Sequence, residues 1–259
     1  MRARLAIAGL LILAGCAHAP YTNRAQLIMV SPQREAALGA QAFNRVVSQS
    51  RLDRDPQLNS LVDDVGRRLA TVANRPDFQW TFVVISDQDA NAFCLPGGKV
   101  AVYTGILPVA QDQTGLAVVL GHEIAHAIAR HGAERMSQAQ LAELGGQALA
   151  IGLGGGASSA AILAAYGLGA QYGLLMPYGR TQESEADHIG LLLMAQAGYD
   201  PRAAIAFWER MERSDGGGTP EFLSTHPSHG TRVEQLRVWM PEALRLYEAS
   251  TPAPNSRVV

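Results

Sequence analysis

A mostly apolar segment, Leu116 to Arg130, carries the polar side chains of His122, Glu123 and His126, and it constrains the fold more than any other part of the chain. Its composition predicts a helix that is buried on all sides. At about 100° per residue, positions i and i+4 lie about 40° apart, so the two imidazoles share one helix face. Histidine and glutamate are rarely buried unless they are paired, so this group favours a bound cation.

The order His-Glu-x-x-His has the spacing that holds Zn²⁺ in zinc peptidases. We therefore expect His122 and His126 to bind the metal. Glu123 lies one position further round the helix and is expected to act as the general base on a metal-bound water. The alternative is coincidence, because two histidines and a glutamate at this spacing also occur on ordinary helices.

A catalytic zinc site needs a third protein ligand. His131 is nearest in sequence, but on a continuing helix it would point about 140° away from His126, so we interpret it as a residue at the C-terminal end of the helix. Glu183 is the better candidate, because it shares a predicted helix face with Asp187. We expect Glu183 to bind the metal and Asp187 to accept a hydrogen bond from a metal-binding histidine. The alternative is an acidic first turn that complements the helix dipole.

The HExxH segment followed by Glu183-Ser184-Glu185-Ala186-Asp187 resembles metallopeptidase family 48, a gluzincin group that includes periplasmic lipoproteins. Further segments that fit the family's pattern are residues 91–93 with 96–105, residues 178–180, and Ser224-Thr225-His226-Pro227 with Arg232. The resemblance implies an α+β fold, a mainly helical gluzincin-type zinc peptidase domain with a small β-sheet beside the HExxH helix. It also implies one Zn²⁺ per chain. We expect the periplasmic lipoprotein branch, without a helical-repeat tail.

Two further site residues follow from this resemblance. By resemblance, His226 can approach the zinc and take the position of the water, which would give a self-inhibited resting state. The alternative is a loop histidine that hydrogen-bonds to backbone. Arg232 is expected either to steady a carboxylate or a tetrahedral oxyanion, or to make a surface ion pair.

The amino end predicts a lipoprotein signal peptide at residues 1–15. Two arginines precede a short apolar run, and Leu13-Ala14-Gly15-Cys16 then predicts cleavage before Cys16 and its lipidation. The run is too short to span a membrane, and a multiply acylated cysteine is a stable anchor. The alternative is an ordinary secretory signal cut near Ala19. Ala17 resembles a signal for release to the outer membrane of a Gram-negative bacterium, so we expect a periplasm-facing protein of the cell envelope.

The remaining chain is expected to comprise a tether at 16–32, one peptidase domain at 33–250 and a disordered tail at 251–259. A net charge of −2 gives no argument for nucleic-acid binding. Once the signal peptide is removed and Cys16 is lipidated, Cys94 is the only cysteine left with a free thiol, so no internal disulfide can form. We interpret Cys94 as a small, half-buried hydrophobic residue.

Periodicity places the other elements at low resolution. Predicted helices cover 33–48, 55–73, 181–198, 200–213 and 233–247, and predicted strands cover 80–85, 91–93 and 99–103. Strand 99–103, if it lies at the sheet edge, could hold substrate as an added strand. The stretch between Glu143 and Arg180 has no charged residue and is rich in glycine and alanine. We interpret it as two soluble helices joined by a loop, the alternative being a membrane-touching surface.

Together these features predict a lipid-anchored, zinc-dependent endopeptidase that cleaves unfolded or misassembled envelope proteins. Its expected partners are such substrates, the membrane through Cys16, and an outer-membrane assembly machinery or a larger protease. One alternative is a chaperone-like assembly factor for outer-membrane proteins with a largely self-inhibited zinc site. Another is an inactive scaffold, which the intact Glu123 argues against.

Overall fold

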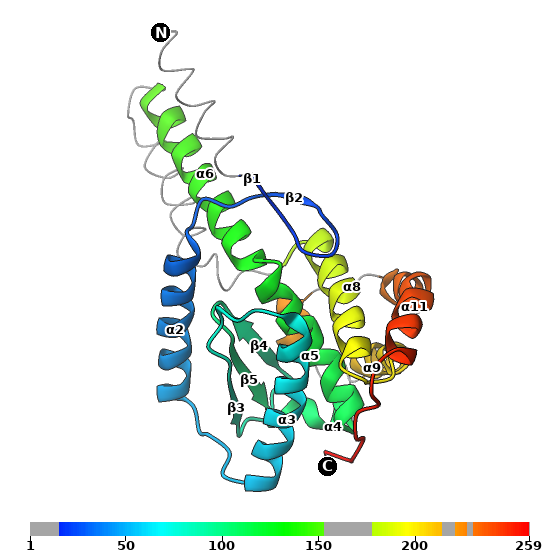
Figure 1. Ribbon diagram of the computed structural model, residues 1–259. Helices are drawn as coiled ribbons and strands as arrows, with labels where there is room; N and C mark the ends of the chain where they lie inside the picture. The colour runs from blue at the N-terminus through cyan, green and yellow to red at the C-terminus, as the bar shows by residue number, and fades with distance from the viewer. Residues whose placement is uncertain (1–15, 153–177, 214–220, 227–229, 259) are drawn as a thin grey trace. The chain divides into compact units, whose positions relative to one another are not determined.

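The computed structural model describes residues 16–152, 178–213, 221–226 and 230–258 (Figure 1). Their contacts divide the chain into two compact units. Unit 1 comprises Met1–Glu35 and Arg130–Met176, and unit 2 comprises Ala36–Ala129 and Pro177–Val259. The domain boundaries that the sequence predicts, 16–32, 33–250 and 251–259, stay a prediction. Each unit is described by itself below.

Unit 1 contains a two-stranded antiparallel sheet, formed by β1 (Cys16–His18) and β2 (Ala25–Leu27), and helix α6 (His131–Gly152). Arg24 makes a bidentate ion pair with Glu134 of α6, at 2.7 and 2.8 Å. The segment expected to be a simple tether is therefore a structured hairpin with specific contacts in its own unit.

The start of α6 departs from the sequence prediction. Arg130 has a left-handed backbone with φ +59°, and its side chain bonds to Glu35 at 2.8 Å and to the carbonyl of Val30 at 2.9 Å. His131 is therefore the first residue of a new helix rather than the C-terminal residue of the preceding one, and it is buried. The reversal of φ at Arg130 breaks the helix between two segments that periodicity alone would join.

Unit 2 is built on a three-stranded sheet of β3 (Thr81–Ile85), β4 (Ala92–Leu95) and β5 (Lys99–Tyr103), in the order β3-β5-β4. β5 runs parallel to β3 and antiparallel to β4. Gly97 and Gly98 have φ values of +84° and +82°, which the turn between β4 and β5 requires. The suggestion that residues 99–103 form the edge is wrong, because β5 is the central strand and β4 lies at the edge.

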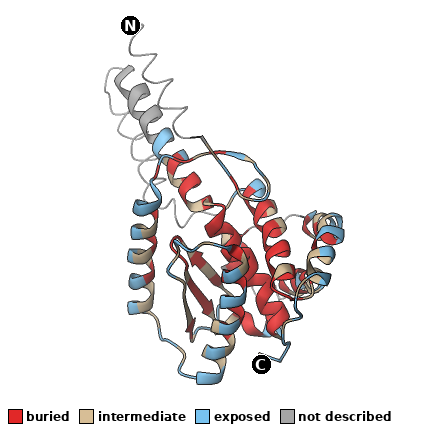
Figure 2. Ribbon diagram, viewed as in Figure 1, coloured by how far each residue is buried: buried red, intermediate tan, exposed pale blue. Residues whose placement is uncertain are grey.

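Helices cover both faces of this sheet (Figures 1 and 2). On one face, α2 (Pro32–Gln49) packs Phe43 against strand residues. On the other, α3 (Pro56–Ala73) contributes Leu69 to the main core together with α5 (Gln113–Ile128). Sheet side chains alternate between the two faces, so each strand contributes to both clusters.

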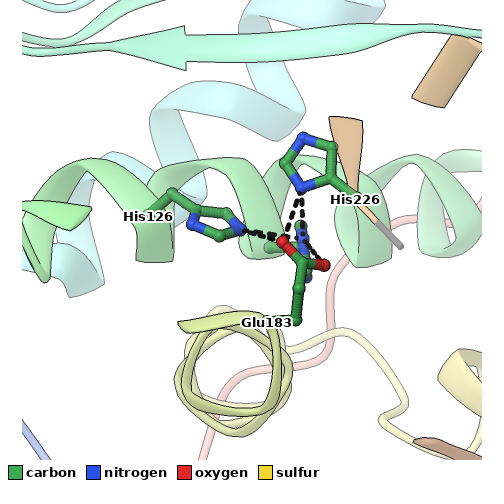
Figure 3. A group of neighbouring side chains, drawn as sticks. His126, Glu183 and His226 are labelled. Carbon is green, nitrogen blue, oxygen red and sulfur yellow. Dashed lines mark hydrogen bonds and ion pairs between the residues drawn. The ribbon is translucent and has the colours of Figure 1, made fainter. Parts of the chain in front are cut away.

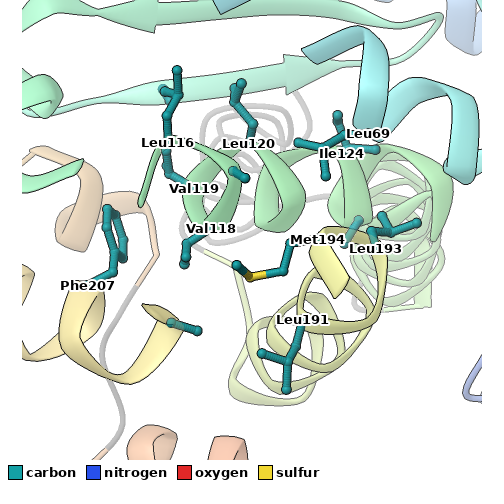
Figure 4. Close-up of a cluster of buried hydrophobic side chains, with 14 of the residues drawn as sticks. Leu69, Leu116, Val118, Val119, Leu120, Ile124, Leu191, Leu193, Met194 and Phe207 are labelled. Carbon is teal, nitrogen blue, oxygen red and sulfur yellow. The ribbon is translucent and has the colours of Figure 1, made fainter. Parts of the chain in front are cut away.

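Every residue of α5 is buried, as expected for a helix that is apolar all round. The side chain of Asp112 caps the helix by accepting a hydrogen bond from the backbone N–H of Gly115 at 2.9 Å. Leu116 and Leu120 face the strands, while Met194, which belongs to a later helix, lies on the opposite side of α5 (Figure 4). The buried polar residues of the HExxH segment thus stand in an otherwise apolar environment.

The remaining elements of unit 2 form a helical layer beyond α5. They are η1 (Thr104–Ile106), α4 (Leu107–Ala110), α8 (Arg180–Gln196), α9 (Ala203–Arg213), α10 (Glu221–Thr225) and α11 (Arg232–Glu248). The helix predicted from residue 200 begins three residues later, at Ala203, after a turn at residues 201–202. Asp200 still accepts a hydrogen bond from the backbone N–H of Arg202 at 3.0 Å, as a capping side chain does.

α5 and α8 approach each other through two glycines. A Cβ added to Gly190 would lie 2.8 Å from the backbone nitrogen of His122, and one added to Gly121 would lie 2.9 Å from the carbonyl oxygen of Gly190. Neither distance is compatible with a side chain. The two helices therefore touch backbone to backbone, directly beside the first histidine of the HExxH segment.

The C-terminal segment differs from the predicted disordered tail. Residues 251–258 run in extended form along the start of α5. The backbone of Gln113 donates to Ser256 at 3.0 Å, and that of Val258 donates to Gln111 at 3.1 Å. These bonds satisfy groups near the first turn of the helix, which explains why the polar segment is ordered.

Two predictions concern segments that lie partly or wholly outside the described residues. The signal peptide at 1–15 is one, and 153–177 of the uncharged stretch is the other. The described part of that stretch belongs to α6, which extends to Gly152. Within the described residues, we find no helix with the length and apolar character needed to cross a membrane.

Replacing Gly190 by alanine tests the backbone contact. Alanine in a helix interior is normally favoured over glycine by about 0.5–1 kcal/mol. Here we expect the opposite sign, a loss of about 1–3 kcal/mol, because the new Cβ must push α8 away from α5. Urea unfolding of the metal-free protein measures the change. Gly179→Ala is the control, because its Cβ meets open space; equal or greater stability of Gly190→Ala would contradict the contact.

Candidate metal centre and active site

The predicted site residues come together in unit 2 from three separate elements (Figure 3). His122, Glu123 and His126 lie in the last two turns of α5, and Glu183 lies in the first turn of α8. His226 directly follows α10. All five side chains are buried.

The distances between the donor atoms match a tetrahedral site. His122 Nε2 lies 3.1 Å from His126 Nε2 and 3.6 Å from Glu183 Oε2. His126 Nε2 lies 3.3 Å from Glu183 Oε1. With zinc–ligand bonds of about 2.0–2.1 Å, tetrahedral ligand atoms stand about 3.3 Å apart. Two imidazole nitrogens and a carboxylate, each of whose oxygens faces one of the histidines, thus fit Zn²⁺ in both chemistry and approximate spacing.

His226 completes the group as a fourth donor. Its Nδ1 lies 3.2 Å from His122 Nε2 and 3.1 Å from Glu183 Oε1. The four ligand atoms all lie within 4.8 Å of one another. The ring therefore points into the cluster, and His226 could supply a fourth ligand where a catalytic zinc site would otherwise hold a water.

Asp187 lies behind His122, as its position one turn after Glu183 suggests. Its Oδ1 is 2.9 Å from His122 Nδ1, which directs the other ring nitrogen, Nε2, toward the cluster. Glu185 does not belong to the group of ligand atoms found among the described residues, and neither does His131.

Arg232 is buried, so the alternative of a surface ion pair is wrong. Its Nε donates to Asp187 Oδ2 at 2.6 Å, and its Nη2 donates to Glu183 Oε2 at 2.8 Å. One guanidinium therefore holds both acidic side chains of α8. Arg232 contacts Glu183 Oε2 and Asp187 Oδ2, whereas the shorter histidine contacts are to Glu183 Oε1 and Asp187 Oδ1.

The carboxylate of Glu123 has a hydrogen bond from one side only. Burial raises its pKa above the ordinary value, although His226, His122 and the donated backbone N–H of Cys94 act in the opposite direction. Its Oε1 makes no hydrogen bond within the described part of the chain and lies 3.4 Å from His226 Nε2. A buried carboxylate with one oxygen free of hydrogen bonds is placed to accept a proton from a water.

The other titrating groups show how charge is distributed. Burial alone would raise the pKa of Glu183, but His126 and His226 outweigh it and hold that pKa well below its ordinary value. Burial would lower the pKa of His122, yet Asp187, Glu183 and Glu123 raise it overall. The cluster is therefore rich in negative charge and attracts a cation.

Aromatic rings enclose the histidines. Tyr178 stacks on His126 with centroids 3.8 Å apart, and Phe222 stacks on His226 at 4.5 Å. Trp208 meets His122 edge to face at 5.3 Å. Sequence reasoning missed Trp208 and Phe222, because an aromatic residue in an amphipathic helix is usually a core residue. Tyr178 was noticed only as part of a family segment.

Cys94 is more deeply buried than predicted, and its thiol is free. Burial, with a further contribution from Glu123, raises the pKa of the thiol well above its ordinary value. It therefore behaves as a small hydrophobic side chain, while its backbone N–H serves the site.

Comparison with known families agrees with this geometry. The sequence model of peptidase family M48 matches residues 56–240, which include the HExxH helix, Glu183 and His226. The chain belongs to peptidase family M48. It is accordingly a metallopeptidase, and the predicted family and α+β fold class are confirmed.

The similar M48 proteins include mitochondrial and bacterial members. The mitochondrial metalloendopeptidase OMA1 of Schizosaccharomyces pombe is 38% identical over 233 residues, covering 87% of this chain and 67% of that protein. Human OMA1 is 40% identical over 185 residues, covering 68% and 35%. The putative β-barrel assembly-enhancing protease of Vibrio cholerae is 36% identical over 209 residues, covering 78% and 42%. The expected lipoprotein branch stays a prediction, since mitochondrial relatives match at least as well.

Metal retention tests the ligand assignment. We expect about one zinc per chain, and Glu183→Gln should weaken binding as much as His122→Ala, because each removes one of three ligands. Asp187→Asn should lose less, about 10–100-fold, because Asp187 acts through His122. Competition with a chromophoric chelator measures these affinities. Glu185→Gln is the matched control on α8; zinc loss in this variant but not in Glu183→Gln would reverse the assignment.

Proposed function

We propose that this M48 protein is a zinc-dependent endopeptidase that cleaves unfolded or misassembled proteins of the cell envelope. The observation that carries the proposal is the tetrahedral spacing of His122, His126 and Glu183 beside a buried Glu123 that keeps one oxygen free of hydrogen bonds. The names of the bacterial relatives support the envelope setting.

The chain's own groups suggest the catalytic roles. Zn²⁺ would polarise the scissile carbonyl and acidify a water. Glu123 removes the proton from that water and returns it to the leaving amine. The hydrogen bond from the Cys94 backbone holds the glutamate in position, while burial raises its pKa and so makes it a stronger proton acceptor.

The edge strand β4 is the best candidate for substrate binding. Phe93 pairs with Ala101 and the carbonyl of Asn91 bonds to Tyr103, so the main-chain groups of Ala92 and Cys94 point away from β5. The N–H of Ala92 already donates to Asn91 Oδ1 at 2.8 Å and that of Cys94 to Glu123, so a substrate strand would bond to the two carbonyls. A substrate added as a strand here would lie next to Glu123. Main-chain recognition depends little on side chains, which suits unfolded substrates.

Glu123→Gln should abolish cleavage of an unfolded protein such as casein while leaving the fold and zinc content intact. The amide cannot accept the water's proton, but it keeps the size of the side chain. Casein digestion and metal analysis of both proteins check this. Residual activity within about tenfold of the wild type would reject Glu123 as the base.

A second candidate function is a chaperone-like assembly factor for outer-membrane proteins with a largely self-inhibited zinc site. The position of His226 Nδ1 among the donor atoms favours it, because an imidazole bound as a fourth ligand would take the place of the nucleophilic water. The two candidates differ in how long His226 stays there. Substrate or a partner would shift that population by a few kcal/mol.

Replacing His226 by alanine separates the two. If the ring inhibits, the variant should cleave unfolded substrate faster than wild type, and its zinc content should fall little because three ligands remain. The measurement is the initial rate at matched zinc occupancy. A rate at or below that of wild type would remove the inhibitory role and leave His226 a structural or substrate-positioning residue.

For location, we propose lipidation at Cys16 and attachment to the periplasmic face of the outer membrane. The support is the sequence before Cys16 and the bacterial relatives. Cys16→Ser should move the protein from the membrane fraction to the soluble fraction or leave the signal uncleaved. Fractionation with a high-salt wash measures it; unchanged, salt-resistant membrane association would argue against this anchor.

A further inference from the structure

A buried guanidinium–indole pair lies behind the metal site and is not used by the proposed reaction. The Cζ of Arg232 lies 3.9 Å from the ring centroid of Trp208. Both side chains are 1% exposed. Arg232 is the first residue of α11 and Trp208 belongs to α9, so the pair joins two helices that contribute no metal ligand.

The pair touches the ligand set at three points. Arg232 holds Glu183 and Asp187 through separate nitrogens, at 2.8 and 2.6 Å. The indole of Trp208 meets the ring of His122 edge to face, with the ring planes at 69°. Asp187 is itself bonded to His122. The guanidinium, the two carboxylates and the imidazole thus form a closed network of contacts, in which each group touches two of the others.

Each contact in this network has a physical reason. Two neighbouring carboxylates repel each other in a buried site, and a cation between them removes that repulsion. The planar fork of arginine fixes the direction of two acceptors, which the single ammonium of lysine cannot do. The face of an indole is the strongest aromatic support for a buried guanidinium.

An oxyanion-binding role for Arg232 does not fit these contacts. Its Nε and Nη2 are committed to carboxylates, and its Nη1 is buried with no hydrogen-bond partner among the described residues. A buried N–H without a partner is unfavourable. An arginine occupies this position despite the unpaired N–H, which indicates that its hydrogen bonds to Asp187 and Glu183 require the forked geometry of a guanidinium.

We propose that Arg232, supported by Trp208, is a positioning residue that fixes Glu183 and Asp187 in metal-binding orientation before the metal arrives. The inference rests on the proposed metal site but not on peptidase activity. Its tests therefore measure metal binding, so that failure of the Glu123 experiment and failure of this one remain distinguishable.

The first test is Arg232→Lys in the full chain, which keeps the charge and removes the fork. We expect zinc affinity to fall about 10–100-fold, as for other groups that act through a ligand. The visible absorption of the Co²⁺-substituted protein should shift, because the carboxylate direction changes. Arg237→Lys is the matched control, on the same helix and exposed. Wild-type affinity and an unchanged Co²⁺ spectrum in Arg232→Lys would overturn the proposal.

The second test separates positioning from general stability. Arg232→Ala leaves a guanidinium-sized space beneath Trp208, so millimolar guanidinium, well below denaturing concentration, should restore part of the zinc affinity. The same additive should not rescue Glu183→Gln, which lacks the ligand itself. If Arg232→Ala loses affinity, gains none with guanidinium and shows a lower melting temperature without metal, the residue is structural and the proposal is wrong.

Trp208 supplies the third comparison. Trp208→Phe keeps an aromatic face and should lose less zinc affinity than Trp208→Leu, which keeps only bulk. A Co²⁺ spectrum that shifts in Trp208→Leu in the same direction as in Arg232→Lys supports the pair acting together. Equal affinities for Phe, Leu and wild type would remove Trp208 from the proposal.

Discussion

The structure depends on an accumulation of negative charge inside an apolar core. Glu123, Glu183 and Asp187 are all buried, and one guanidinium lies among them. An unpaired charge in such a core costs several kcal/mol, and breaking a buried pair costs about 3–5 kcal/mol. A bound metal cation would supply the missing positive charge. The helices around α5 therefore exclude water from the site and also hold acidic groups together, two effects that normally oppose each other.

Sequence alone predicted most of the cluster because the spacing of its residues is local. His122 and His126 share a helix face by periodicity, and Glu183 with Asp187 shares another, so each pair is fixed by one helix. Trp208 and Phe222 could not be predicted as site residues, because their contacts with the histidines form only when α9 and α10 pack in the folded protein. The central place of β5 was missed for a similar reason: strand order is set by the crossover from β3, which leaves no signal within β5 itself. The C-terminal segment has few apolar side chains, and its order comes from backbone groups left unpaired at the start of α5.

His226 links two parts of the site through one ring. Its Nδ1 faces the donor atoms of His122 and Glu183, while its Nε2 faces Glu123. Phe222 stacks on one side of this ring, and Tyr178 lies parallel to it at 5.1 Å. The backbone of Tyr178 also bonds to Thr225, immediately before His226. A movement of α10 would therefore change the surroundings of Glu123 and of the His122–Glu183 pair together.

The glycine contact between α5 and α8 has a consequence for how this site tolerates change. Main-chain atoms have no rotamers, so the spacing of the two helices at Gly121 and Gly190 is set by atoms that almost every substitution leaves unaltered. Substitution of the leucine, valine and methionine side chains around the two glycines would leave these backbone atoms in contact. The separation of α5 and α8 beside the metal site is therefore set by backbone rather than by side-chain packing.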